Sequence, residues 1–229
     1  MTVQHQISDE LLLDYASGSL AEGWSIAVAT HLALCPQSRI RLSRIEAAAG
    51  AMMDMAEVET PDRSDQSWQS MRARLDASSD LLVAQKPAAR KTVRAASPVL
   101  PEPVLPEPLR SYLGSDADKL RWKPLGRGAY QIPIKTADGE TSVRLLRIPA
   151  GKPVPEHSHG GRELTLVLKG SYHDGHARFA RGDLEEADET LQHQPIADKG
   201  EDCICLAVTD APLRFKSRLL RLVQPFLGI

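Results

Sequence analysis

A proline-rich segment divides this chain and limits its fold more than any other feature of the sequence. Six prolines lie between residues 86 and 108. Each proline fixes φ and removes a backbone hydrogen-bond donor, so this stretch favours an extended linker over a helix or a central strand. We therefore expect a domain at residues 1–85, a linker at 86–108 and a second domain at 109–229. The total of 229 residues suits two domains of moderate size.

The residues before the linker carry the start and stop signals of helices. Ser8 is a suitable N-cap for a first helix, and Gly18 is a suitable stop. Apolar residues recur at helical spacing from about residue 21, Pro36 suits the first turn of a third helix, and Asp65 can cap a fourth. The sequence thus predicts a small N-terminal helical bundle.

The N-terminal domain is acidic, with 12 Asp and Glu residues against 6 Lys and Arg residues in residues 1–85. An acidic surface of this kind is often only solvated, and it can also meet a basic protein partner. If the domain binds a partner, we expect Trp24, Val28 and Leu32 to anchor it, because these apolar residues recur at helical spacing.

After the linker, the hydrophobic period changes from that of helices to that of strands. Apolar and β-branched residues predict strands at 129–134, 142–148, 163–168 and 202–208. Glycine-containing turns separate these runs, and no helical pattern lies between them. The pattern predicts an antiparallel β-sandwich or barrel, and residues 214–222 are expected to add one short helix.

The strongest chemical signal is a group of histidines and one glutamate in the second domain. His157, His159 and Glu163 are all at odd positions, so in an extended segment their side chains share one face of a sheet. His193 follows a glycine turn and can enter a neighbouring strand as a fourth member. Imidazole and carboxylate groups bind zinc, iron, manganese or nickel, and residue type alone does not choose among these metals. The alternative is a hydrogen-bonded cluster without a metal.

A weaker pattern lies in the N-terminal domain. His31 and Cys35 are four residues apart, so they share one face at the end of the predicted second helix. Together with ligands from elsewhere, such a pair could bind zinc. The other two cysteines, Cys203 and Cys205, share one face of a predicted strand and are either buried core residues or an oxidation-sensitive pair.

Composition and charge exclude several classes of protein. A net charge of −2 and an aromatic content of 4% argue against direct nucleic-acid binding. No apolar run is long enough to span a membrane, and the N-terminus lacks the profile of a signal peptide. Three cysteines cannot form a disulfide framework, so reduced thiols are expected. We expect a cytoplasmic protein that binds neither nucleic acid nor membrane.

The histidine and glutamate positions resemble a known motif. Five residues are spaced as in the first cupin motif, namely Gly151, His157, His159, Glu163 and Gly170. The resemblance implies a cupin β-barrel, or jelly roll, with the metal ligands His157, His159, Glu163 and His193. Zinc is the expected metal, and iron, manganese and nickel are the alternatives.

The two halves of the chain together resemble a family of regulators. The first helix and the His31-x3-Cys35 pair are similar to a zinc-binding anti-sigma domain, and with the Cys203-Ile-Cys205 segment the whole chain resembles the ChrR family of anti-sigma factors. In that family the helical domain masks an extracytoplasmic-function sigma factor. The cupin domain is needed for the response to singlet oxygen or organic hydroperoxides, and each domain carries zinc. The resemblance thus implies an α+β, two-domain negative regulator of transcription in the oxidative stress response.

Two residues of the N-terminal domain depart from the family pattern. Gln6 and Ser38 stand where the family has a histidine and a cysteine. Neither an amide nor a hydroxyl is a good zinc ligand. The remaining candidate ligands are His31, Cys35 and the neighbouring His5, so the residues for a second zinc site are incomplete.

Two other functions compete with the anti-sigma interpretation. Cupins with this ligand set also include metal-dependent enzymes, dioxygenases and isomerases, in which an open metal position activates oxygen or polarises a carbonyl. The attached helical domain and linker argue against an enzyme, because a single-domain cupin enzyme does not need them. The departures at Gln6 and Ser38 also allow a metal sensor that no longer binds a sigma factor. The main prediction is a regulator that is not an enzyme.

Overall fold

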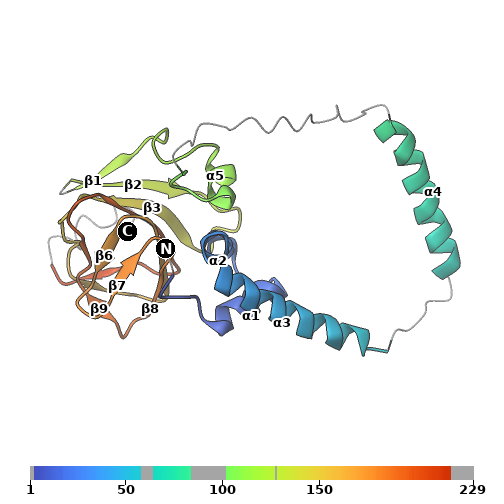
Figure 1. Ribbon diagram of the computed structural model, residues 1–229, viewed down its shortest axis with the longest axis horizontal. Helices are drawn as coiled ribbons and strands as arrows, with labels where there is room; N and C mark the ends of the chain where they lie inside the picture. Colours follow the sequence, from blue (N-terminus) through green and yellow to red (C-terminus); the bar gives the residue numbers. More distant parts are fainter. Residues whose placement is uncertain (1–2, 58–63, 84–101, 127, 218–229) are drawn as a thin grey trace. The chain divides into compact units, whose positions relative to one another are not determined.

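The structure is a computed structural model of the whole chain (Figure 1). It describes residues 3–57, 64–83, 102–126 and 128–217. The chain divides into two compact units, one formed by Met1–Ala49 together with Pro103–Ile229 and the other by Gly50–Glu102. The first helices therefore belong with the C-terminal strands, whereas the sequence predicts a separate domain at residues 1–85. We call residues 3–49 the head.

The N-terminal helices are present as the sequence predicts. The helices are α1 (Asp9–Ser17), α2 (Glu22–Leu34), α3 (Pro36–Asp54), α4 (Ser64–Val83) and α5 (Glu107–Leu113). Ser8 caps α1, because its side chain accepts a hydrogen bond from the backbone N–H of Leu11 at 3.3 Å. Gly18 ends this helix in the left-handed conformation, with a φ of 71°. Among the described residues, no helix combines the length and the apolar character that a membrane crossing requires.

Short strands make up the C-terminal part. They are β1 (Lys123–Gly126), β2 (Ala129–Ile134), β3 (Ser142–Ile148), β4 (His157–Ser158), β5 (Glu163–Lys169), β6 (Ser171–His173), β7 (Arg178–Ala180), β8 (Leu184–Ala187), β9 (Gln192–His193), β10 (Ile196–Ala197), β11 (Cys203–Thr209) and β12 (Arg214–Phe215). Two of them, β2 and β3, coincide with predicted runs, and β5 and β11 match the other two predicted runs to within one residue. The prediction of a short helix at 214–222 is wrong for its first residues, because Arg214–Phe215 form β12. Residues 218–222 of this predicted helix lie outside the described part of the chain.

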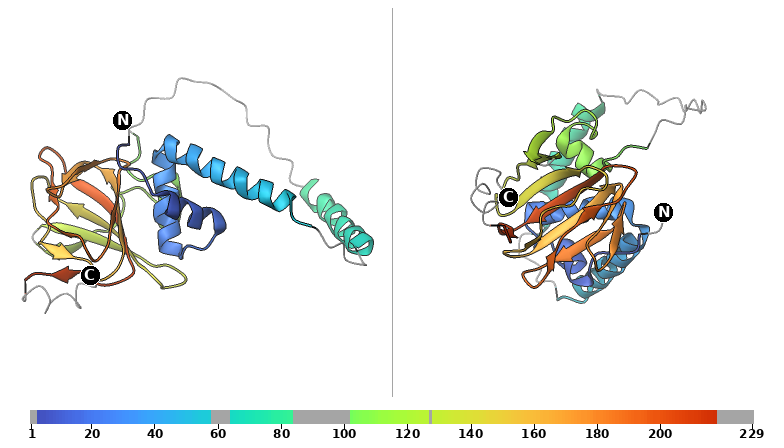
Figure 2. Two further views of the ribbon diagram at one scale, coloured as in Figure 1. Left: turned by 90° about the horizontal axis from the view of Figure 1, so that it is seen from below. Right: turned by 90° about the vertical axis from the view of Figure 1, so that its left-hand side faces the viewer.

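The strands form two antiparallel layers, which confirms the predicted β-sandwich (Figure 2). One layer is a six-stranded sheet in the order β1-β2-β3-β11-β5-β8. The other layer consists of two three-stranded sheets, β10-β6-β7 and β12-β4-β9. We call the two layers together the barrel.

The central strands of the six-stranded sheet are buried on both faces. Leu164, Leu166 and Leu168 of β5 belong to the core that the sheet shares with the head. Val167 belongs to a second core, inside the barrel. Strand β11 contributes to the same two cores in alternation. Ile204, Leu206 and Val208 belong to the core shared with the head, and Cys203 and Cys205 belong to the core inside the barrel. A strand that is covered on both faces has a nearly continuous apolar sequence, and this explains the lack of polar alternate residues in β11.

The head and α5 cover the outer face of this sheet (Figures 1 and 2). Val28 and Leu32 of α2 are buried in the same core as the outer leucines of β5. Leu105 and Leu109 are fully buried in that core as well. The linker predicted at 86–108 thus ends in folded structure, and its part before residue 102 lies outside the described residues.

This packing overturns the expected partner-binding face of α2. The sequence predicts that Trp24, Val28 and Leu32 anchor a partner. Val28 and Leu32 instead lie in the core, and Trp24 is half-buried against it. The prediction is wrong because the apolar face of α2 covers the sheet and is not available to another protein.

The docking of α2 on the sheet predicts an unusual effect of a substitution at Gly23. Helix propensity alone makes a glycine-to-alanine change in a helix stabilising by about 0.5–1 kcal/mol. At Gly23, however, a Cβ atom would overlap Thr141 Oγ1 and lie 2.5 Å from Val143 Cγ2. We therefore expect Gly23→Ala to destabilise the protein by about 1–3 kcal/mol, measured by urea unfolding.

Gly50→Ala is the matched control for this prediction. Gly50 lies in α3, and no neighbouring atom is within 4 Å of its Cβ position. This substitution should stabilise the protein, as helix propensity requires. An equal gain at Gly23 would contradict the docking of α2 on the barrel.

Candidate metal centre

Three histidines come together where β4 pairs with β9. His157 in β4 lies directly opposite His193 in β9 in the strand register. His159 follows β4 in the chain, and Glu163 opens β5. All four side chains are buried. The structure thus brings together the three histidines that the sequence singled out, with Glu163 beside them.

The three imidazole rings are close enough to share one ion. Their ring nitrogens, one each from His157, His159 and His193, all lie within 4.8 Å of one another. Nε2 of His157 is 3.2 Å from Nε2 of His193. Nδ1 of His157 donates a hydrogen bond to the carbonyl oxygen of Pro155 at 2.8 Å. With its proton on Nδ1, the neutral imidazole of His157 turns an unprotonated Nε2 to the cluster, as in many metal-binding histidines.

Glu163 lies at the edge of the cluster. Its Oε2 atom is 3.4 Å from Nδ1 of His159, and its Oε1 atom accepts a hydrogen bond from Thr165 Oγ1 at 2.9 Å. Burial alone would raise the pKa of Glu163, but the neighbouring imidazoles of His159 and His157 outweigh burial and lower the pKa. The carboxylate is therefore ionised and offers a negative charge to a cation.

The cluster fits a metal ion better than a purely hydrogen-bonded group. Neither ring nitrogen of His159 has a hydrogen-bond partner among the described residues, although the side chain is buried. An unpaired polar group in such a position costs about 1–3 kcal/mol. Burial lowers the pKa of His157 to about 4, which keeps its imidazole neutral at neutral pH. Neutral imidazole is the form that binds metals, and metal binding by these four residues stays a prediction.

A small cavity adjoins the cluster. It has a volume of about 80 Å³, and the cysteines Cys203 and Cys205 lie in its wall. Their Sγ atoms are 3.5 Å apart, and both thiols are free and buried. The hydrogen bond with Cys203, together with burial, raises the pKa of the Cys205 thiol well above its ordinary value. In this state Cys205 is a protonated and unreactive thiol.

Two acidic residues beside the cluster are not apparent from the sequence. Glu185 Oε1 lies 3.2 Å from Nδ1 of His193, and Asp174 Oδ2 lies 3.7 Å from the same atom. Burial opposes protonation of His193, but the adjacent carboxylate of Glu185 raises its pKa. Glu185 is one of two adjacent glutamates in β8, and only the pairing of β8 with β5 decides which of them turns inward.

The candidate residues of the N-terminal zinc pattern form a hydrogen-bonded group. His31 is fully buried, and its Nδ1 donates to the carbonyl oxygen of Gly182 at 3.0 Å. Its Nε2 therefore accepts a hydrogen bond from the Ser38 hydroxyl at 2.9 Å. The same hydroxyl oxygen is 3.2 Å from Cys35 Sγ. Ser38 thus lies beside both candidate ligands and satisfies them without an ion.

The other two positions of that pattern face different neighbours. The His5 ring packs against Phe179, with the ring centroids 4.4 Å apart. Gln6 is exposed, and its side-chain oxygen lies 3.5 Å from Arg41 Nη1. Among the described residues, the head therefore offers one imidazole and one thiol at this place. A structural zinc site takes four ligands, so the donor set does not fit one.

The buried imidazole of His31 makes the stability of the protein depend on pH. Burial lowers the pKa of His31 from 6.5 to about 4. Between these values the unfolded chain binds a proton that the folded chain does not bind, so stability falls as the pH decreases through this window. The measured quantity is the difference in unfolding free energy between the wild type and His31→Asn. We expect this difference to fall by about 3 kcal/mol when the pH is lowered from about 7 to about 4.

Urea unfolding of both proteins at the two pH values measures this difference. The subtraction removes the titration of the histidine cluster, because that titration is common to both proteins. A difference that does not change with pH would show that His31 can bind a proton in the folded state.

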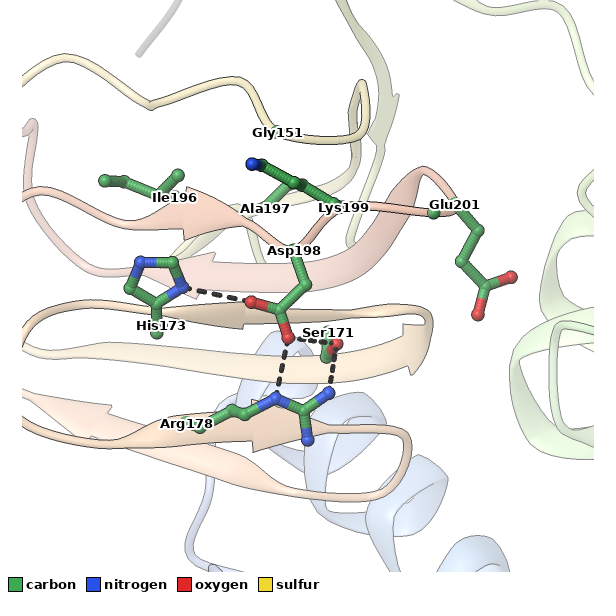
Figure 3. Close-up of a pocket in the computed structure, with 10 residues that line it drawn as sticks. Gly151, Ser171, His173, Arg178, Ile196, Ala197, Asp198, Lys199 and Glu201 are labelled. Atoms are coloured by element: carbon green, nitrogen blue, oxygen red, sulfur yellow. Dashed lines mark hydrogen bonds and ion pairs between the residues drawn. The ribbon is translucent and has the colours of Figure 1, made fainter.

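A further polar group lies on the surface of the barrel (Figure 3). Asp198 accepts hydrogen bonds from Ser171 Oγ and Arg178 Nε, both at 2.6 Å, and lies 3.0 Å from Nδ1 of His173. The hydrogen bond from Ser171 is the largest cause that lowers the pKa of Asp198 to about 2. Because these groups already pair with one another and His173 is exposed, the arrangement is typical of a surface ion-pair network.

Comparison with known proteins identifies the family of the chain. A family model described as the ChrR cupin-like domain matches residues 112–212. The anti-sigma-E factor ChrR of Cereibacter sphaeroides is 44% identical over 229 residues, which covers 100% of both chains. A chain in the crystal structure of Rhodobacter sphaeroides SigE in complex with the anti-sigma ChrR is 40% identical, with a TM-score of 0.72 over 91% of this chain and 100% of that chain. The histidine cluster and the helical head thus occur in a chain that belongs to the ChrR family of anti-sigma factors.

Proposed function

We propose that this protein holds an extracytoplasmic-function sigma factor inactive in the cytoplasm and releases it on an oxidative signal. The observation that carries the proposal is the alignment of the whole chain, helices and barrel together, with the anti-sigma-E factor ChrR. A similar chain of known structure is in complex with the sigma factor SigE. The family is one of regulators, and no enzymatic activity is proposed.

Exposed apolar side chains on α3 and α4 support a protein-binding role. Met52 and Met53, near the end of α3, are 74% and 77% exposed. Trp68 and Met71 in α4 are 61% and 51% exposed, and their spacing of three residues places them on one face of the helix. Large exposed apolar side chains are typical of protein-interaction surfaces. We assign sigma binding to this surface, in place of the α2 face that the sequence favours.

Charge supports the encounter with a basic partner. Residues 1–85 carry 12 acidic residues against 6 basic residues. Complementary charge increases the association rate more than the affinity. The association rate with a basic sigma factor should therefore fall as the salt concentration increases.

We assign the sensing step to the histidine cluster and its cavity. The residues that would hold the cation, with zinc the expected metal, are His157, His159, Glu163 and His193. A bound cation would supply the charge that keeps these side chains, from separate strands, in one arrangement. The cavity of about 80 Å³ admits only a small molecule, and Cys203 and Cys205 lie in its wall. Singlet oxygen and small organic hydroperoxides are signals of suitable size, and oxidation of a metal ligand would loosen the barrel at β4 and β9.

Binding to a purified sigma factor tests the proposal. The full chain is titrated calorimetrically with Rhodobacter sphaeroides SigE and other extracytoplasmic-function sigma factors, before and after treatment with tert-butyl hydroperoxide or a singlet-oxygen photosensitiser. We expect a complex that blocks transcription by the sigma factor and that weakens after treatment. Absence of binding to every sigma factor would favour a sensor without this partner. Steady-state turnover of a diketone by iron- or manganese-loaded protein would favour the enzyme.

A further inference from the structure

Strand β8 lies between the histidine cluster and the segment of residues 3–8 that leads into α1. It is an edge strand of the six-stranded sheet and pairs on one side with β5. Neighbouring residues of a strand point to opposite faces. Glu185 accordingly turns into the barrel, whereas Glu186 turns outward to the head. One short strand therefore contacts both the cluster and the head.

Inside the barrel, Glu185 contacts one histidine of the cluster. The side chain is buried, and its Oε2 atom accepts a hydrogen bond from the Tyr172 hydroxyl at 2.5 Å. Its Oε1 atom lies 3.2 Å from Nδ1 of His193. The other nitrogen of that ring, Nε2, is 3.2 Å from Nε2 of His157. A carboxylate beside the far nitrogen of a ligating imidazole fixes the orientation of the ring, so Glu185 is placed to direct His193 at the cluster.

Outside the barrel, β8 and the turn before it bind the N-terminal segment. Asp183 Oδ1 accepts hydrogen bonds from the backbone N–H groups of Gln4 and His5, at 2.6 and 2.9 Å. The backbone N–H of Leu184 donates to the carbonyl oxygen of His5 at 3.0 Å. The segment thus lies along the edge of β8 that does not pair with β5.

Glu186 connects the same strand to the start of α1. Its Oε1 atom accepts a hydrogen bond from the backbone N–H of Ser8 at 2.7 Å, and its Oε2 atom accepts one from the Ser8 hydroxyl at 3.1 Å. Ser8 is also the residue that caps α1. The position of β8 therefore determines the position of the cap of the first helix.

We propose that Glu185 is a positioning residue for His193 and that β8 transmits the state of the histidine cluster to the head. A cation in the cluster would fix the position of His193. The contact between the His193 ring and Glu185 would then restrain β8. In turn, β8 holds residues 4–8 in place through its hydrogen bonds to them. Without the cation, His193 loses this restraint and the N-terminal segment is held less firmly. The coupling is reciprocal, so a looser segment also weakens metal binding. This inference rests on the proposed function, because it explains how a signal in the barrel reaches the helices.

Metal affinity of the full chain, without any sigma factor, tests the positioning role. We expect Glu185→Gln to bind Zn²⁺ about 10–100-fold more weakly than the wild type, in competition with a chromophoric chelator. The visible spectrum of the Co²⁺-loaded protein should change as well, because it reports the arrangement of the ligands. Glu201→Gln is the matched control, since Glu201 is exposed and pairs with Lys169 at 3.7 Å.

Tyr172→Phe keeps the carboxylate of Glu185 but removes its hydrogen-bond donor. This variant should weaken Zn²⁺ binding in the same direction by a smaller factor, and it provides the test if Glu185→Gln does not fold. An unchanged Zn²⁺ affinity and an unchanged Co²⁺ spectrum in the variant that folds would overturn the positioning role.

Hydrogen exchange tests the transmission through β8. The amides of Gln4, His5 and Ser8 should exchange at least about tenfold faster in the metal-free chain than in the Zn²⁺-bound chain. The amides of β1 and β2, at the opposite edge of the sheet, should not change. In Glu186→Ala, which removes the acceptor for the Ser8 N–H, the amide of Ser8 should exchange fast in both states.

The outcomes of these tests are distinguishable. Equal exchange with and without Zn²⁺, in a wild-type chain that binds the ion, would overturn the transmission alone. Failure of the wild-type chain to bind Zn²⁺ would overturn the inference together with the metal part of the proposed function. Failure to bind a sigma factor is a separate result, because neither measurement involves one.

Discussion

Replacement of His159 by alanine is expected to remove metal binding from the barrel and to abolish signal-dependent release, while sigma binding remains. His159 is buried, and neither of its ring nitrogens has a hydrogen-bond partner among the described residues. Apart from the contact of its Nδ1 atom with Glu163 Oε2 at 3.4 Å, its imidazole makes few polar interactions that alanine would lose, other than those with an ion. Structural zinc sites with four ligands bind with about 10–16 kcal/mol, so one ligand contributes about 3 kcal/mol, or more than about a hundredfold in affinity.

His173→Ala is the matched control for this prediction. His173 is an exposed histidine of the same barrel, and it pairs with Asp198 outside the cluster. The measurements are the metal content after dialysis and the release of SigE by tert-butyl hydroperoxide. Full metal content and normal release in His159→Ala would contradict the assignment of the sensor to the cluster.

Replacement of Trp68 by alanine is expected to weaken sigma binding by at least about 2 kcal/mol, or about thirtyfold. A Trp at the centre of an interface contributes a large apolar area and is the residue type most often found at such positions. Trp68 is exposed in α4, so its loss should change the unfolding free energy by less than about 0.5 kcal/mol. The loss of binding is therefore separable from any loss of folding.

Tyr130→Ala serves as the control for Trp68→Ala. Tyr130 is also an exposed aromatic residue, but it lies in β2 of the barrel. Calorimetric titration of both variants with SigE measures the affinities. Equal affinities of the two variants would exclude α4 from the sigma-binding surface.

Features that depend on short spacings could be predicted from the sequence. The strands β2 and β3 begin and end where the sequence predicts them, at 129–134 and 142–148. Ser8 and Gly18 bound α1 because caps act within one helical turn. The histidine cluster was recognisable for a similar reason, since His157 and His159 are two residues apart.

The position of the head on the barrel could not be predicted, although one signal pointed to it. In the predicted strand at 202–208, residues 203–208 are apolar on both alternating faces, which is typical of a strand covered on both faces. The sequence does not say which element covers the second face. The proline-rich segment favours separate domains, and the apolar residues of α2 can equally well be assigned to a partner.

The sequence by itself determined which chemical groups the protein has and which of them share a face of a helix or strand. Only the tertiary structure decided what these groups meet. His31 lies against Ser38 and the carbonyl oxygen of Gly182, 151 residues away, and the described residues around it do not supply the four ligands of a structural zinc site. Glu185 turns to His193, and the apolar face of α2 lies on the sheet. The reason is that backbone geometry sets side-chain direction over a few residues, whereas contacts between distant residues depend on how whole elements pack.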